Sequence, residues 1–183
     1  MLKNYIVIIK SSFIAILLAS NIALAENVQV KFAYIGQKDH SALLGAQQGL
    51  SEANLQGQFL NQIYELDLIS AEDANTHDFS NYIAVLTAVD TDSYTKLADT
   101  LPNIAVFNLS IKDDQLRSTC IKNTLHVIPS NAMETDAKNQ WQKKKPDSTV
   151  NAQAWHPDFV KFAARDLNKR FKKNQKKLMD DNS

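Results

Sequence analysis

The residues Tyr82–Ala88 (YIAVLTA) form a short, almost wholly apolar run, and this run most constrains the fold. A strand that is apolar at successive positions has both faces buried, which is typical of a parallel sheet covered by helices on both sides. Other strand-like runs precede and follow it, separated by helical segments of roughly ten to fifteen residues. The predicted strands are Val28–Ile35, Ile63–Leu68, Tyr82–Ala88, Ile104–Phe107 and Leu125–Ile128.

The segments between and after these strands carry apolar residues at helical spacing. Ser41 can cap the first helix, Asp90 can cap the second, and Asn131 with Glu134 matches a capping box. The expected helices are 41–53, 94–101, 131–144 and 157–176, with an irregular or short helical stretch at 70–80. The pattern predicts an α/β fold: a doubly wound parallel sheet of about five strands with helices on both faces, plus a C-terminal helix.

The first 25 residues have the three parts of an export signal. Met1–Lys10 carries two lysines and no acid, Ser11–Ala19 is mostly apolar, and Ala23-Leu24-Ala25 gives a small-x-small cleavage pattern. We therefore predict a signal peptide cleaved after Ala25 and a periplasmic protein. A membrane anchor is the alternative, but Lys10 and the serines after it interrupt the apolar stretch of about 20 residues that a span needs.

The expected layout follows from these segments. It comprises a signal peptide (1–25), an α/β lobe (26–145), a linker (146–156), an amphipathic C-terminal helix (157–177) and a tail (178–183). Without the signal peptide the chain carries 18 basic and 20 acidic residues, a net charge of −2 that gives no reason to expect nucleic acid as a partner. Cys120 is the single cysteine, so no internal disulfide forms, and we expect a half-buried structural thiol.

In a doubly wound fold, ligands bind at the carboxyl ends of the strands. Here those ends lead into the loops 36–40, 88–93 and 108–110, all of which carry hydrogen-bonding side chains. The predicted ligand-binding residues are Gln37, His40, Asp90, Ser93, Asn108 and Ser110. Solvated turns and helix caps are the alternative interpretation, because serine and aspartate are the usual cap residues.

The motifs of common enzyme classes are missing from the sequence. It contains no nucleophile elbow, no phosphate-binding loop and no dinucleotide-binding glycine pattern, and its four histidines lack metal-ligand spacing. We therefore predict no catalytic residue, no metal, no cofactor and no enzymatic activity. The least favoured alternative is a metal-dependent enzyme in which Asp39-His40 and His77-Asp78 form two halves of one site.

The C-terminal region is basic. Between Lys161 and Lys177 eight lysines and arginines stand against one acid, Asp166. A solvated outer face of a helix is the commoner explanation, because long basic side chains cover apolar surface. Contact with an anionic membrane or partner is the alternative.

Two stretches resemble a known family. Leu116–Ala137 (LRSTCIKNTLHVIPSNAMETDA) is similar to a run in periplasmic substrate-binding proteins of ABC transporters, and Trp155–Phe159 with Leu167–Phe171 resembles a segment near their carboxyl end. The subgroup is branched-chain amino-acid-binding-like and is associated with pyrroloquinoline-quinone (PQQ)-dependent alcohol dehydrogenase systems. The matching residues of the first run are Leu116-Arg117, Cys120, Asn123, Leu125-His126, Pro129-Ser130, Ala132-Met133 and Asp136-Ala137; Phe32–Gly36 and Gly45–Leu50 fit the start of the first lobe.

This resemblance implies a non-enzymatic periplasmic solute-binding protein of an ABC transporter system, linked to PQQ-dependent alcohol or methanol oxidation. Its implied partners are a small-molecule solute and an ABC permease or periplasmic dehydrogenase. The family has two lobes, whereas only about a dozen residues separate Lys145 from the late motif, too few for a second lobe of roughly 100 residues. A homodimer could complete the half-cleft. An accessory protein that has lost solute binding and docks a dehydrogenase or transporter is the alternative.

Overall fold

The computed structural model describes residues 27–159 and 161–183. The predicted signal peptide, 1–25, lies outside the described residues. Among the helices that are described, none is long and apolar enough to cross a membrane.

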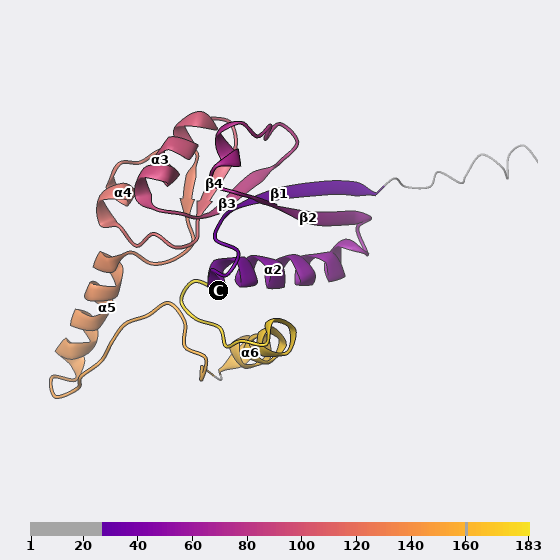
Figure 1. The fold of residues 1–183 in the computed structure, drawn as a ribbon. Helices are drawn as coiled ribbons and strands as arrows, with labels where there is room; N and C mark the ends of the chain where they lie inside the picture. Colours follow the sequence, from indigo (N-terminus) through magenta and orange to yellow (C-terminus); the bar gives the residue numbers. More distant parts are fainter. Residues whose placement is uncertain (1–26, 160) are drawn as a thin grey trace, which may run out of the picture.

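Five parallel strands form one sheet, which confirms the predicted fold class (Figure 1). In space the strands follow the order β2-β1-β3-β4-β5, so the chain runs from β1 to one edge and then returns past β1 to build the other side. Each strand begins and ends within two residues of its predicted bounds. The strands are β1 (Val28–Gly36), β2 (Gln62–Ile69), β3 (Ala84–Ala88), β4 (Ala105–Asn108) and β5 (Thr124–His126).

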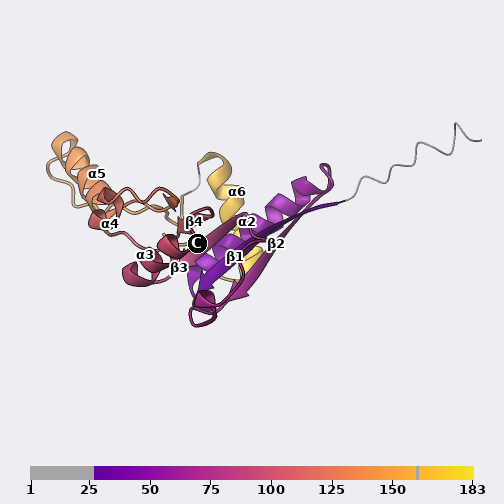
Figure 2. The same ribbon diagram turned by 90° about the horizontal axis from the view of Figure 1, so that it is seen from above.

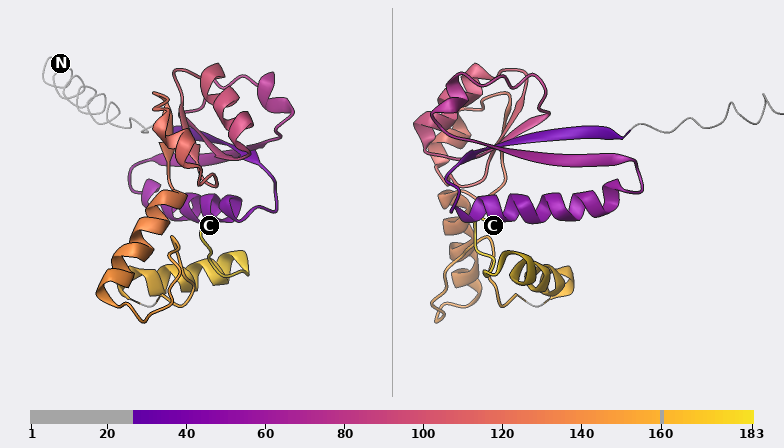
Figure 3. Two further views of the ribbon diagram at one scale, coloured as in Figure 1. Left: turned by 90° about the vertical axis from the view of Figure 1, so that its left-hand side faces the viewer. Right: turned by 45° about the vertical axis from the view of Figure 1, so that its right-hand side comes forward.

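Helices cover both faces of the sheet, as Figures 2 and 3 show from two further directions. The long helix α2 (Ser41–Gly57) covers one face, and α6 (Phe162–Gln175) packs against α2 on the side away from the sheet. The other face carries the short helix η1 (Asp73–Asn75), α3 (Thr91–Thr100) and α4 (Asp114–Ser118). Helix α5 (Asn131–Lys144) extends away from the sheet and has no buried residue.

The buried apolar side chains form two clusters, one on each face of the sheet. The larger cluster lies under α3 and α4 and includes Val85, Val106 and Tyr94, whose hydroxyl donates to the Val106 carbonyl at 3.1 Å. The smaller cluster lies under α2 and includes Tyr34 and Leu43. Because β3 contributes to both, its successive residues are buried, which explains the apolar run seen in the sequence.

Several local predictions were wrong. The N-cap of α2 is His40 and not Ser41: the His40 Nδ1 accepts a hydrogen bond from the Ala42 N–H at 3.1 Å. The N-cap of α5 is Ser130, one residue before the predicted Asn131. Helix α4 was not predicted. Cys120, expected to be half-buried, is exposed; it follows α4 in the left-handed conformation, with φ 50°, in the loop before β5.

Helix α6 also begins later than predicted, at Phe162 and not near Pro157. The residues before it fold back onto the helix, because the Asn168 amide donates to the carbonyls of Pro157 and Phe159 at 2.9 and 3.2 Å. The Trp155 indole N–H completes this arrangement by donating to the Asn168 side-chain oxygen at 2.9 Å. These bonds occupy backbone groups that a longer helix would have used itself.

Polar contacts attach the C-terminal region to the sheet domain. Arg170 of α6 makes two hydrogen bonds to the Glu52 carboxylate of α2, at 2.9 and 3.1 Å. The Lys112 ammonium bonds Glu134 at 2.6 Å and Asp181 at 2.9 Å, which joins the loop after β4 to α5 and to the C-terminal tail. The hydrogen bond to Glu134 is the main reason that the pKa of Lys112 is raised. The C-terminal segment is thus part of one folded unit.

The end of β1 requires a glycine, because a Cβ at Gly36 would lie 2.8 Å from the Ala88 carbonyl oxygen. We expect Gly36→Ala to lower the free energy of unfolding by about 1–3 kcal/mol, through the displacement that this overlap forces. Gly49→Ala is the matched control: nothing lies within 4 Å of its Cβ, and alanine favours a helix interior by about 0.5–1 kcal/mol. Urea unfolding of both variants measures the difference. Equal effects would contradict the close approach of β1 and β3.

Candidate functional site

The carboxyl ends of β1, β2 and β3 surround an open cavity of about 620 Å³. The chain leaves β1 toward β2 on one side and returns to β3 on the other, so no crossover connection covers the ends of β1 and β3. Doubly wound sheets bind ligands at such a switch in strand order. The volume lies within the range of about 300–1,000 Å³ that small-molecule sites occupy.

The structure brings most of the predicted ligand-binding residues to this cavity. Gln37 and His40 come from the loop after β1, Asp90 and Ser93 from the start of α3, and Ser110 from the loop after β4. Asn108 is fully buried and does not line the cavity.

His40, Asp90 and Ser93 take part in helix caps. The Asp90 carboxylate accepts from the Ser93 backbone N–H at 2.9 Å and from the Ser93 hydroxyl at 2.7 Å. Hydrogen bonds from Ser93, its backbone N–H first, lower the pKa of Asp90, which keeps the group ionised. The His40 ring bonds the first turn of α2. A solute would therefore meet these three side chains in positions that the caps already fix.

Gln37 and Ser110 differ from those three. Within residues 27–159 and 161–183, neither the Gln37 amide nor the Ser110 hydroxyl makes a hydrogen bond, although both line the cavity. Each can donate and accept. These two side chains are the ones in the predicted set that remain available to a polar solute.

Asn108 uses its whole side chain to hold the loop after β4. Its side-chain oxygen accepts from the N–H groups of Ser110 and Ile111, at 3.1 and 2.8 Å. Its amide donates to the Ile111 carbonyl at 2.7 Å and to the His126 Nδ1 at 2.9 Å. This network fixes the backbone of Ser110 at the cavity, so Asn108 positions a lining residue.

The cavity also contains residues that the sequence interpretation did not single out. Ser70, Ala71 and Glu72 follow β2, and Lys38 lies in the loop after β1. Lys38 and Glu72 bring opposite charges to the wall. The sequence predicts the strand Ile63–Leu68 before the loop that carries Ser70, Ala71 and Glu72, but the position of this loop beside β1 depends on the strand order.

Tyr34 lines the cavity next to Gly36, and its hydroxyl oxygen would lie 2.9 Å from a Cβ at that position. Its hydroxyl donates to the Gln37 carbonyl at 3.4 Å. Burial, with the nearby Asp39 carboxylate, raises the pKa of Tyr34 to about 12. The hydroxyl therefore stays protonated and serves as a donor that orients the loop carrying Gln37.

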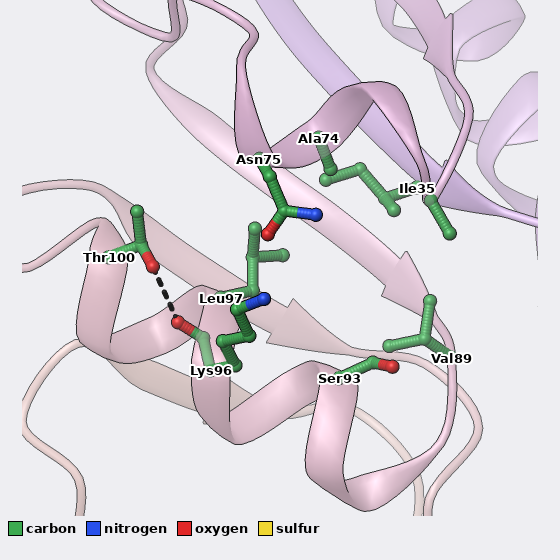
Figure 4. A pocket seen from close by; sticks show the side chains of 9 residues that line it. Ile35, Ala74, Asn75, Val89, Ser93, Lys96, Leu97 and Thr100 are labelled. Atoms are coloured by element: carbon green, nitrogen blue, oxygen red, sulfur yellow. Dashed lines mark hydrogen bonds between the residues drawn. The ribbon is translucent and has the colours of Figure 1, made fainter.

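A second, smaller pocket of about 100 Å³ lies between η1 and α3 and shares Ala71, Val89 and Ser93 with the cavity. Figure 4 shows the apolar side chains of Ile35, Ala74, Val89 and Leu97 facing this space, with Asn75 and Lys96 beside them. The pocket gives the main cavity a mostly apolar extension on the α3 side.

The two predicted halves of a metal site are engaged elsewhere. His40 caps α2, and the His77 Nε2 lies 3.2 Å from the Tyr82 hydroxyl, which donates to Asp67 at 2.8 Å. Across the described ranges, no group of three or more histidine, cysteine, aspartate or glutamate side chains is placed to hold a metal ion.

No family model matches this chain, and no curated protein matches it. A solved structure that matches is that of a possible leucine/isoleucine/valine-binding protein from Rhodopirellula baltica SH 1. The two chains share 16% sequence identity and a TM-score of 0.49, over 68% of this chain and 38% of the other. The present chain therefore covers less than two fifths of that protein's length.

The Asn108–His126 contact predicts a pH dependence of stability. Burial, and then the charge of Arg117, lowers the pKa of His126 below its ordinary value of 6.5. A proton on Nδ1 would also face the Asn108 amide donor. The unfolded chain therefore takes up this proton more readily, and stability is lost as the pH falls below 6.5.

Urea midpoints measured from about pH 8 to pH 5 should fall less steeply in His126→Gln than in the parent protein. His156→Gln, at an exposed histidine, is the control for the substitution itself and is measured in parallel. Identical pH profiles for the parent and His126→Gln would contradict a neutral, donor-paired His126.

Proposed function

We propose that this chain is a non-enzymatic binding protein that captures a small polar solute at the carboxyl ends of β1, β2 and β3. The observation that carries the proposal is the cavity of about 620 Å³ at the switch in strand order, with uncommitted polar side chains on its wall. The sequence resemblance to periplasmic substrate-binding proteins supports the same function.

The wall of the cavity favours a particular class of solute. Gln37 and Ser110 offer hydrogen bonds, while Lys38 and Glu72 offer charges of both signs. The small pocket beside Val89 adds room for a short apolar group. A small molecule with polar or charged groups and a modest apolar part fits these features.

The remaining parts of the proposal rest on the sequence alone: the predicted signal peptide indicates the location, and the resemblance indicates the partner and the link to alcohol oxidation. They are a periplasmic location, an ABC permease or dehydrogenase as partner, and a link to PQQ-dependent alcohol or methanol oxidation. The cavity is open, and tight sites bury about 70–90% of a ligand's surface. We therefore expect a partner or a second copy of the chain to supply the missing wall for high affinity.

A second candidate function is an interaction protein that docks a dehydrogenase or transporter. The observation in its favour is the exposed apolar surface near β5 and α5, where Leu125, Val127, Met133 and Trp141 are 45–61% exposed. Salt-insensitive association would point to this surface, whereas strong salt dependence would point to the basic helix α6.

Metal content after gentle purification tests the metal-dependent enzyme, the least favoured alternative.

A thermal-shift screen tests solute capture. The screen covers small periplasmic solutes, including the quinone cofactor, alcohols, organic acids and lanthanide ions. A ligand at about 100 times its Kd adds about 2.7 kcal/mol of stability. For a chain of this size we expect a rise in Tm of about 5–10 °C. A cooperative transition that no solute moves would favour the interaction protein.

For any solute that the screen identifies, we expect Gln37→Ala with Ser110→Ala to weaken binding by about tenfold or more, since each removes a hydrogen bond worth about 0.5–1.5 kcal/mol. Neither side chain is bonded within the described protein, so Tm without solute should stay the same. Gln29→Ala, an exposed glutamine at the other end of β1, is the matched control. Unchanged solute affinity in the double variant would remove this site from the proposal.

A further inference from the structure

The sheet face that α2 covers is exposed at its far edge, on β5. Leu86, Phe107 and Leu125 are in register on β3, β4 and β5, so their side chains share one face. This is the face under α2, because Leu86 packs against the cluster that contains Tyr34. Leu125 is 48% exposed, and Val127, two residues further on, is 61% exposed. All-parallel sheets have helices over both faces, so a helix is expected here. We call Phe107, Leu109, Leu125 and Val127 the open face.

Helix α5 carries an apolar stripe of matching length. Met133, Ala137 and Trp141 recur at every fourth residue, so they lie on one side of the helix, and all three are exposed. The stripe is about 12 Å long, at 1.5 Å per residue. Along β4, the residues on the α2 side of the sheet run from Ala105 to Leu109, about 13 Å. The stripe is therefore as long as the surface that lacks a helix.

The first turn of α5 is bonded to Lys112 and to the start of α4, which fixes its direction. The Asn131 N–H donates to the Lys112 carbonyl at 3.0 Å, and the Ala132 N–H donates to the Asp114 carboxylate at 2.9 Å. The Lys112 ammonium also bonds Glu134. Figure 1 shows α5 extending away from the strands. While these bonds hold, α5 does not cover the open face of its own sheet.

The charges of the two surfaces are complementary. The last turn of α5 carries Lys143 and Lys144. Asp180 lines a hollow of about 360 Å³ beside Leu109 and Val127, at the carboxyl end of the open face. Asp180 is exposed and makes no ion pair with any residue that the structure describes. A helix laid on the open face with its C-terminal end toward this hollow would bring its lysines to an unpaired carboxylate.

We propose that α5 of a second copy of the chain covers the open face, and that the exchange is mutual. A two-fold contact brings the same two surfaces together twice, so one dimer covers both open faces and both stripes. This assigns to a second copy the surface that the second candidate function gives to a dehydrogenase or transporter. The proposal is independent of solute capture, and its tests need no solute.

Cysteine cross-linking tests the exchange in protein purified after expression of the full chain. The variant carries Leu125→Cys and Ala137→Cys in a Cys120→Ser background, and a short bismaleimide joins cysteines that lie close together. We expect a dimer-sized product on a denaturing gel. Leu125→Cys with Asn139→Cys is the matched control, because Asn139 is exposed and lies on the opposite side of α5 from Ala137. Its dimer yield should be at least severalfold lower.

Three outcomes would overturn the proposal. Equal dimer yields from the two variants would mean collision without an interface. A product of monomer size in which both cysteines are linked would mean that α5 covers its own sheet. The absence of any linked product would leave the open face to a different protein.

The stripe has its own test. Trp141→Asp should weaken dimerisation by about tenfold or more, because a carboxylate placed against an apolar face loses its hydration. Asn139→Asp adds the same charge on the opposite side of α5 and should leave the Kd of the dimer unchanged. Sedimentation equilibrium measures both values. No residue of α5 is buried within one copy, so both variants should fold, which circular dichroism checks. An unchanged Kd in Trp141→Asp would remove α5 from the interface.

Discussion

Strand β1 pairs in parallel with β2 on one side and with β3 on the other, and the rest of the structure depends on this placement. Parallel neighbours need crossover connections of a dozen or more residues, which cross a face of the sheet. Helix α2 carries the chain from β1 to β2 over one face, and η1 lies in the return to β3 over the other. The first connection leaves the end of β1 and the second leaves the end of β2, on opposite faces of the sheet, and the cavity lies open at the strand ends between them.

Much of this arrangement could be predicted from the sequence, because a strand that is buried on both faces has apolar residues at successive positions, as residues 82–88 do. The errors lie where local preference is ambiguous. His40 caps α2 through a ring nitrogen, although the neighbouring serine is the commoner cap type. Helix α4 spans only five residues, too short for a helical repeat to show. Both depend on tertiary packing.

The candidate site was predictable as an edge of the sheet but not as a set of contacts. Asp90 and Ser93 are residue types that cap helices and also bind solutes, and sequence alone does not separate the two roles. The Asn108 amide turns inward because His126, far along the chain, accepts from it. The loop after β2 joins the cavity through the strand order, which local patterns do not encode.

The nine residues of β1 run from Val28 to Gly36 at the cavity, a distance of about 26 Å. The cavity therefore lies at one end of the sheet, where β1, β2 and β3 all end. A second wall for the cavity, from a partner or another copy of the chain, would approach from this end, where no described helix closes the cavity.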